Sequence, residues 1–220
     1  MNFDLIEYDI VPLYTRENIA EFLFSDQEEE FLSTKKCKEY VDQYLQRLAP
    51  AILFAMKRDG WKIVITNHQN LEQEFGFSYK IYGLTHWETK RILLYASQKA
   101  IEFALAHEIG HYLDHFLGDI SKTGAWTRIR QKHFPCRIPN DYFVEDLSSN
   151  LEYFAECFLL YSNEKEVLKT CNIDAYQFFA KIDRHIDDIV ESLPPLNDCE
   201  KTQDPMFQGL QSELNYMLSV

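Results

Sequence analysis

The sequence predicts one α+β domain, with helices toward both ends of the chain and a small sheet between them. Three observations lead to this fold class. The 220 residues suffice for one sizeable domain and leave no room for a second of full size. The 46% of apolar residues is enough to build a packed core. Along the chain, the spacing of apolar residues changes from a helical period to short β-rich runs and back to a helical period.

The N-terminal part, residues 1–60, is predicted to be helical, most clearly from Lys38 to Gly60. Apolar residues recur there at helical spacing. Pro50 is expected to divide this stretch into two helices, and Gly60 is expected to end the second one. We treat residues 1–60 as part of the same domain, where they either cover the sheet or position a substrate.

The central part, residues 61–193, is predicted to form the sheet and the core of the domain. β-rich runs predict three strands, at residues 61–66, 77–83 and 90–96. The strand at residues 90–96 directly precedes the next helix, and we expect its edge to pair with an extended substrate.

A helix is predicted from Ser97 onward, because apolar residues return to spacings of three and four. Gly118 follows the last of them and is expected to end this helix. The apolar stripe consists of Ile101, Leu105, Ile109, Tyr112 and Phe116. Further helices are predicted at residues 126–133, 149–161 and 174–190, with a C-terminal helical segment at residues 194–220.

The charge, the hydropathy and the cysteines argue against several classes of function. The net charge of -13 disfavours nucleic-acid binding, because contacts to phosphate need clustered Lys and Arg. No segment approaches the roughly 20 apolar residues that cross a bilayer, and no basic secretory signal opens the sequence. The five cysteines are scattered without a C-x-x-C pair, which is typical of free thiols in a reducing compartment. We expect a cytoplasmic protein, with delivery as an effector by another route left open.

The pattern H-E-x-x-H occurs in the predicted helix, at His107, Glu108 and His111. Residues four apart lie on the same face of a helix, so both histidines can present a ring nitrogen to one zinc ion. Glu108 points to the neighbouring side of the same cavity, where its carboxylate can take a proton from an activated water and pass it to a leaving amine. The amphipathic helix disfavours the alternative of histidines without a ligand role. His115 would lie too far along the axis to complete a tetrahedral site.

A second helix offers the third ligand, because zinc sites with two histidines commonly add a glutamate. Glu152 and Glu156 are four residues apart and share one face of this helix. We expect Glu152 to bind the metal and Glu156 to accept the second ring N–H of a ligating histidine. Ser149 and Glu152 also have the spacing of a capping box, in which Glu152 would turn back to the backbone of Ser149. In that alternative, Glu156 would be the ligand.

Three segments together resemble the catalytic domain of anthrax lethal factor and its relatives, which include the clostridial Pro-Pro endopeptidases. They are residues 91–115 (RILLYASQKAIEFALAHEIGHYLDH), 152–160 (EYFAECFLL) and 174–186 (DAYQFFAKIDRHI). The resemblance covers about half of the chain, and the glutamate helix is what distinguishes this family from other zincins. It implies a zincin-like fold, with a small sheet, a histidine helix and a downstream glutamate helix.

The resemblance also implies an activity and a set of roles. The chain would be a zinc endopeptidase of the gluzincin type, with one Zn²⁺ on His107, His111 and Glu152 and with Glu108 as general base. The family has a tyrosine before the ligand glutamate whose hydroxyl stabilises the oxyanion. The family's spacing would place it at residue 145, which is a glutamate here, and Tyr142 lies three residues upstream. We therefore expect Tyr142 to take this role.

Two other functions are compatible with the same residues. The first is an intracellular regulatory metallopeptidase that acts on a repressor, which would suit a chain without an export signal. The second is a zincin-fold domain that binds a partner without turnover. Degenerate domains of that kind usually lose the base or a histidine, and this sequence keeps Glu108 and both histidines. If the chain is a peptidase of either kind, the expected partner is a protein or peptide substrate.

Overall fold

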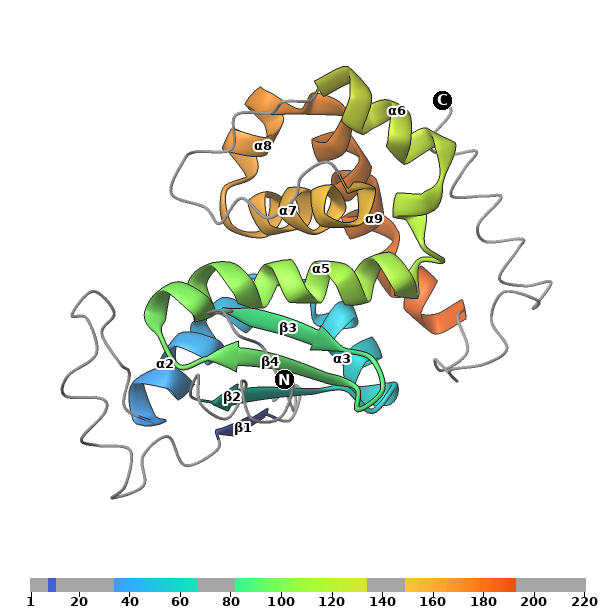
Figure 1. Cartoon of the computed structure of the whole chain (residues 1–220). Coiled ribbons are helices and arrows are strands. Elements are labelled where there is room, and N and C mark those ends of the chain that lie inside the picture. Colours follow the sequence, from blue (N-terminus) through green and yellow to red (C-terminus); the bar gives the residue numbers. More distant parts are fainter. Residues whose placement is uncertain (1–7, 11–33, 67–81, 134–148, 193–220) are drawn as a thin grey trace.

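The computed structural model describes residues 8–10, 34–66, 82–133 and 149–192 of the chain (Figure 1). A mixed sheet and a set of helices lie on opposite sides of the long helix α5, which crosses the middle of the domain. The predicted α+β class is confirmed. The elements, in chain order, are β1 (Tyr8–Ile10), α2 (Thr34–Leu45), α3 (Pro50–Arg58), β2 (Lys62–Thr66), β3 (Gly83–His86), β4 (Arg91–Tyr95), η1 (Ala100–Ala104), α5 (Leu105–Phe116), η2 (Ile120–Lys122), α6 (Gly124–His133), α7 (Asn150–Asn163), α8 (Lys165–Cys171) and α9 (Ile173–Ser192).

The sheet has the strand order β1-β2-β4-β3. β1, β2 and β4 run parallel, and β3 pairs antiparallel with β4. The run from Ile92 to Tyr95 is fully buried, as expected for a strand with a neighbour on each side. β3 lies at the edge of the sheet, and its residues are only half-buried.

The predicted substrate edge is therefore wrong. Residues 90–96 contain β4, which lies inside the sheet between β2 and β3, so both rows of its backbone groups are already paired. The edge strand next to the histidine helix is β3. It covers residues 83–86, and residues 67–81, which hold most of the predicted strand 77–83, lie outside the described part of the chain.

The predicted division of the N-terminal helical stretch is confirmed. Pro50 is the first residue of α3, a position where its missing N–H costs no helical hydrogen bond. Gly60 follows α3 with φ 81°, a left-handed conformation that suits glycine. The prediction that residues 1–60 are helical is wrong at Tyr8–Ile10, which form the strand β1. Helix α8 is a further element that the sequence did not predict, and the division of the chain at residues 60 and 193 stays a prediction.

The predicted apolar stripe is buried, with Ile101 in η1 and its other four residues in α5. A π-helical turn, η1, leads into it, and Gly118 follows its last residue with φ 88°. Asp114 is buried and accepts hydrogen bonds from the backbone N–H and the hydroxyl of Ser121, both at 2.7 Å. On the opposite side, the hydroxyl of Tyr112 donates to Asp59 at 2.9 Å. The helix is thus held against both α3 and the segment that follows it.

Helix α7 lies against α5 on the side away from the sheet (Figure 1). Its far side joins an aromatic cluster around Trp126, whose ring lies 4.9 Å from that of Phe154 and 5.3 Å from that of Phe178. Trp126 is fully buried, and its indole N–H donates to the backbone carbonyl of Asn150. This cluster joins α6, α7 and α9 into one layer and fixes the position of α7 over α5.

Gly110 is the point of closest approach between the two helices. A Cβ atom at this position would lie 2.9 Å from the Cα and 3.3 Å from the Cβ of Ala155. A backbone atom cannot rotate away from such a contact, so any side chain at position 110 would push α5 and α7 apart.

We expect Gly110→Ala to lower the free energy of unfolding by up to about 2 kcal/mol. Overpacking typically costs 1–3 kcal/mol, and only about 1 kcal/mol of it is offset by the better helix propensity of alanine. Urea denaturation with the metal removed would measure the difference. Gly124→Ala is the matched control, because its Cβ would meet only Arg128 Nη1 at 3.6 Å, an ordinary contact. Equal stability of the two variants would contradict this account of the helix contact.

Candidate metal centre

Three side chains from α5 and α7 form a cluster that can hold a metal ion. One ligand atom each of His107, His111 and Glu152 lie within 4.8 Å of one another. The Nε2 atoms of His107 and His111 lie 3.1 Å and 3.5 Å from the same carboxylate oxygen, Glu152 Oε2. The structure thus brings together the three residues that the sequence proposed as ligands. Two imidazole nitrogens and one carboxylate oxygen are a donor set that suits zinc and leaves a fourth position open.

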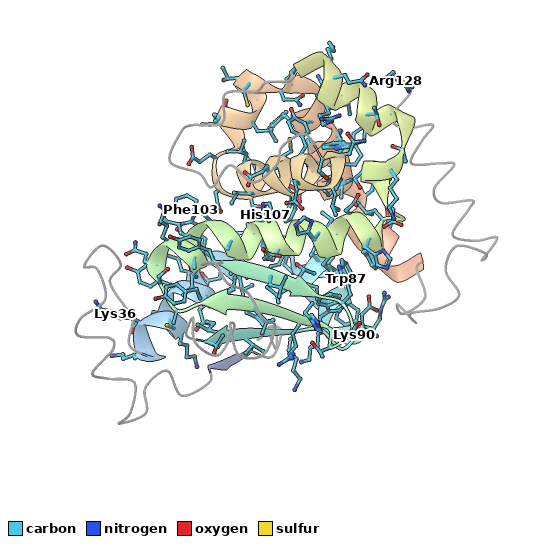
Figure 2. All side chains as sticks on the ribbon, in the orientation of Figure 1. Lys36, Trp87, Lys90, Phe103, His107 and Arg128 are labelled. Atoms are coloured by element: carbon cyan, nitrogen blue, oxygen red, sulfur yellow. The ribbon has the colours of Figure 1, made fainter. Side chains whose placement is uncertain are left out.

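His107 lies between two glutamates of α7. Figure 2 shows its ring on the face of α5 that is turned toward α7. While Nε2 faces Glu152, Nδ1 lies 3.0 Å from Glu156 Oε1, and both His107 and Glu156 are buried. In a neutral imidazole, a carboxylate on Nδ1 holds the proton there, fixes the ring's orientation and leaves Nε2 available to a metal. Glu156 thus lies in hydrogen-bond contact with His107, as expected for a supporting residue, and its role stays a prediction.

Without a metal ion, the charged forms of the histidines and of Glu152 stabilise one another. Burial by itself lowers the pKa of His107, but the hydrogen bonds to Glu152 and Glu156 reverse this effect and raise it well above its ordinary value. Burial by itself would raise the pKa of Glu152, but its hydrogen bonds to His107 and His111 lower it. The site therefore already favours an ionised carboxylate, which is the form that binds a cation.

The capping-box alternative for Glu152 is not what the structure shows. Ser149 is the N-cap of α7, and its side chain accepts a hydrogen bond from the backbone N–H of Leu151 at 3.2 Å. The cap is formed by the serine alone, so Glu152 is free to face the two histidines.

Glu108 lies on the neighbouring side of α5, against the edge strand β3. Its side chain is 7% exposed. The hydroxyl of Thr85 lies 2.6 Å from Glu108 Oε2 and 3.1 Å from the backbone carbonyl of Glu108. Sequence reasoning missed Thr85, because a threonine in a short strand carries no signal of which helix residue it will face.

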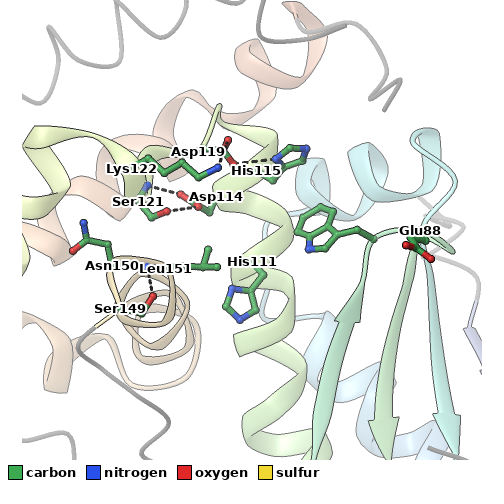
Figure 3. A pocket seen from close by; sticks show the side chains of 11 residues that line it. Glu88, His111, Asp114, His115, Asp119, Ser121, Lys122, Ser149, Asn150 and Leu151 are labelled. Carbon is green, nitrogen blue, oxygen red and sulfur yellow. Dashed lines mark hydrogen bonds and ion pairs between the residues drawn. The ribbon is translucent and has the colours of Figure 1, made fainter. Parts of the chain in front are cut away.

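A pocket of about 620 Å³ begins at His111 and extends toward the C-terminal end of α5. Figure 3 shows its walls, which come from the β3–β4 turn, the last turns of α5, the segment after α5 and the start of α7. The lining residues are Trp87, Glu88, His111, Asp114, His115, Asp119, Ser121, Lys122, Ser149, Asn150 and Leu151. Because His111 belongs to both, the pocket is continuous with the metal cluster.

The other candidate residues have separate outcomes. His115 is turned away from the cluster: its Nδ1 lies 3.0 Å from Asp119 Oδ1, and this hydrogen bond lowers the pKa of Asp119 to about 2. Tyr142, the predicted oxyanion donor, lies outside the described residues, so its role stays a prediction.

Within the described part of the chain, no helix is both long enough and apolar enough to cross a membrane.

A histidine helix packed between a glutamate helix and a mixed sheet with an antiparallel edge strand defines a zincin-like metallopeptidase fold. Residues 85–182, somewhat less than half of the chain, match the family described as anthrax toxin lethal factor, N- and C-terminal domain. Among solved structures, the chain is similar to the Pro-Pro endopeptidase PPEP-2 from Paenibacillus alvei. The TM-score is 0.54 and the sequence identity 21%, over 69% of this chain and 93% of that chain.

At this identity the structural likeness establishes the fold alone. The comparison with curated proteins found no match. Residues 85–182 thus match the lethal factor family, as the motifs predicted, and the fold is similar to that of a Pro-Pro endopeptidase.

We expect Glu156→Gln to weaken zinc binding by about 10-fold to 100-fold, because loss of a carboxylate that supports a ligating histidine typically has this effect. Glu152→Gln should weaken it further, since it removes a ligand. Competition with a fluorescent chelator measures the zinc dissociation constant of each variant. Glu166→Gln is the control, because the Glu166 side chain is exposed on α8 and its carboxylate lies 3.8 Å from Lys169 Nζ. Wild-type affinity in Glu156→Gln would show that Glu156 does not support the site.

Proposed function

We propose that this chain is a zinc-dependent endopeptidase that hydrolyses peptide bonds of a protein or peptide substrate. The observation that carries the proposal is the convergence of His107, His111 and Glu152 on one point, with the carboxylate of Glu108 on the adjoining face of the same helix. His107, His111 and Glu152 would hold one zinc ion, and Glu156 would orient His107. When bound there, zinc supplies a Lewis acid that acidifies a water molecule and polarises the scissile carbonyl.

Glu108 would act as the general base and then as the general acid. Its carboxylate takes the proton from the attacking water and transfers it to the nitrogen of the leaving amine. The site around it is largely closed to solvent: His107 and Glu108 are both 7% exposed. Exclusion of water strengthens the electrostatic effects on which this proton transfer depends. We further propose that Tyr142 donates a hydrogen bond to the oxyanion.

The substrate would bind in an extended form along β3. β3 is the terminal strand of the described sheet and pairs with β4, so its other row of backbone groups faces outward. An extended peptide can add to such an edge through main-chain hydrogen bonds. The pocket beside His111 is also lined by Trp87, the residue after β3, and would receive a side chain of the bound peptide. The edge strand thus aligns the peptide, and the pocket selects among its side chains.

We expect Glu108→Gln to lower peptide cleavage by about 10²-fold to 10⁴-fold, the usual contribution of a general acid–base group. Zinc content should stay at the wild-type level, because Glu108 is not one of the three proposed ligands. Mass spectrometry of a mixed peptide library, incubated with each protein, would detect the cuts and their sequence preference. A parallel incubation of the wild type with a zinc chelator should abolish the same cuts.

Glu166→Gln serves again as the control, since this exposed glutamate has no place in the site. Cuts that persist unchanged in Glu108→Gln would contradict the proposed mechanism. A wild-type protein that binds one zinc and produces no cuts would favour a partner-binding domain without turnover.

A further inference from the structure

The carboxylate of Glu108 has a specific hydrogen-bond donor on the edge strand. Thr85 Oγ1 lies 2.6 Å from Glu108 Oε2 and 3.1 Å from the backbone oxygen of the same residue. A hydroxyl carries one proton, and the shorter contact to a charged acceptor is the stronger bond. We therefore assign this proton to the hydrogen bond with the Glu108 carboxylate.

Gly83 leaves the space that this carboxylate occupies. A Cβ atom at Gly83 would lie 2.8 Å from both Cγ and Oε1 of Glu108 and 2.9 Å from Cβ of Ala104. Gly83 and Thr85 are two residues apart in a strand, so they present the same face to α5. One residue supplies room for the side chain and the other supplies a donor to it.

This contact limits the conformations of Glu108. A glutamate has three side-chain torsions, and an ionised carboxylate that is nearly buried needs hydrogen-bond partners to remain there. Thr85 binds Oε2, and the backbone of Gly83 lies next to Oε1. These contacts hold the carboxylate in one orientation, from which it can take part in proton transfer.

We propose that Thr85 is a positioning residue for the general base: its hydroxyl, together with the space at Gly83, fixes the Glu108 carboxylate for proton transfer. This inference rests on the proposed function of Glu108. It also connects the base to substrate binding, because β3 is the strand on which the peptide is proposed to lie. The peptide and the base are then both aligned by the same four-residue strand.

The test compares Thr85→Val, which keeps the shape and removes the donor, with Thr85→Ser, which keeps the donor. We expect Thr85→Val to lower kcat by about 10-fold to 100-fold, the effect of a lost hydrogen bond to a charged group. KM should change by less than about twofold, because Thr85 is not proposed to touch the substrate through its side chain. Thr85→Ser should recover most of kcat. The substrate is a peptide that the wild-type protein cuts in the library experiment.

Three further measurements separate positioning from a structural role. The zinc dissociation constant of Thr85→Val should match that of Thr85→Ser, and circular dichroism should show that both variants are folded. A crystal structure of the metal-free Thr85→Val protein should show the Glu108 carboxylate rotated away from residue 85. Thr170→Val is the control for the substitution itself, since the Thr170 hydroxyl is exposed on α8 and donates to the backbone of Glu166.

Three results would overturn the proposal: wild-type kcat in Thr85→Val, a Thr85→Ser variant as impaired as Thr85→Val, or a change confined to KM. If Thr85→Val does not fold, Thr85→Ala replaces it and is compared with Thr85→Ser by the same criteria. A wild-type protein that cuts no peptide would refute the proposed function and this inference with it. Cuts by the wild type together with an unaffected Thr85→Val would refute this inference alone.

Discussion

The close contact of α5 and α7 at Gly110 is the constraint on which the whole site depends. The residues that follow the contact on each helix are His111 and Glu156, and the residues three positions before it are His107 and Glu152. Because Gly110 and Ala155 are small, the helices approach closely enough for His107 Nε2 to lie 3.1 Å from Glu152 Oε2. A side chain at position 110 would separate the helices and so separate the ligands. The aromatic cluster around Trp126 maintains the same contact from the other side of α7.

The spacing of four residues serves both helices in the same way. On α5 it places two imidazoles on one face, and on α7 it places two carboxylates on one face. Because the faces meet, His107 is in contact with one carboxylate through each of its ring nitrogens. One carboxylate is then available as a metal ligand and the other as its support. The burial of the two side chains supports the proposed division of roles, since Glu156 lies deeper than Glu152: their side chains are 5% and 22% exposed.

The parts of the site that obey a helical period could be predicted from the sequence, and the parts that depend on the sheet could not. His107, His111, Glu152 and Glu156 follow from i,i+4 spacing, and only the capping box left a choice between the two glutamates. The order of the strands is not encoded in any local period, and for this reason the sequence predicts the substrate edge wrongly at residues 90–96. The uninterrupted apolar run of β4 was the available signal, because such a run is typical of a strand with neighbours on both sides. β1 pairs with a strand more than fifty residues away in the sequence, which local spacing does not reveal.

The contacts that attach the edge strand β3 to the domain include the one that orients the carboxylate of Glu108. β3 is short and half-buried, so burial of apolar area contributes less to holding it than it does for β2 and β4. Its hydrogen bonds to β4 and the bond from Thr85 to Glu108 therefore account for a larger share of its attachment to the domain. Glutamine at position 108 keeps an oxygen that can accept the Thr85 hydrogen bond, whereas alanine leaves that hydroxyl without its acceptor and a void beside Gly83. For this reason the glutamine variant separates loss of the base from loss of the edge strand, and the alanine variant changes both.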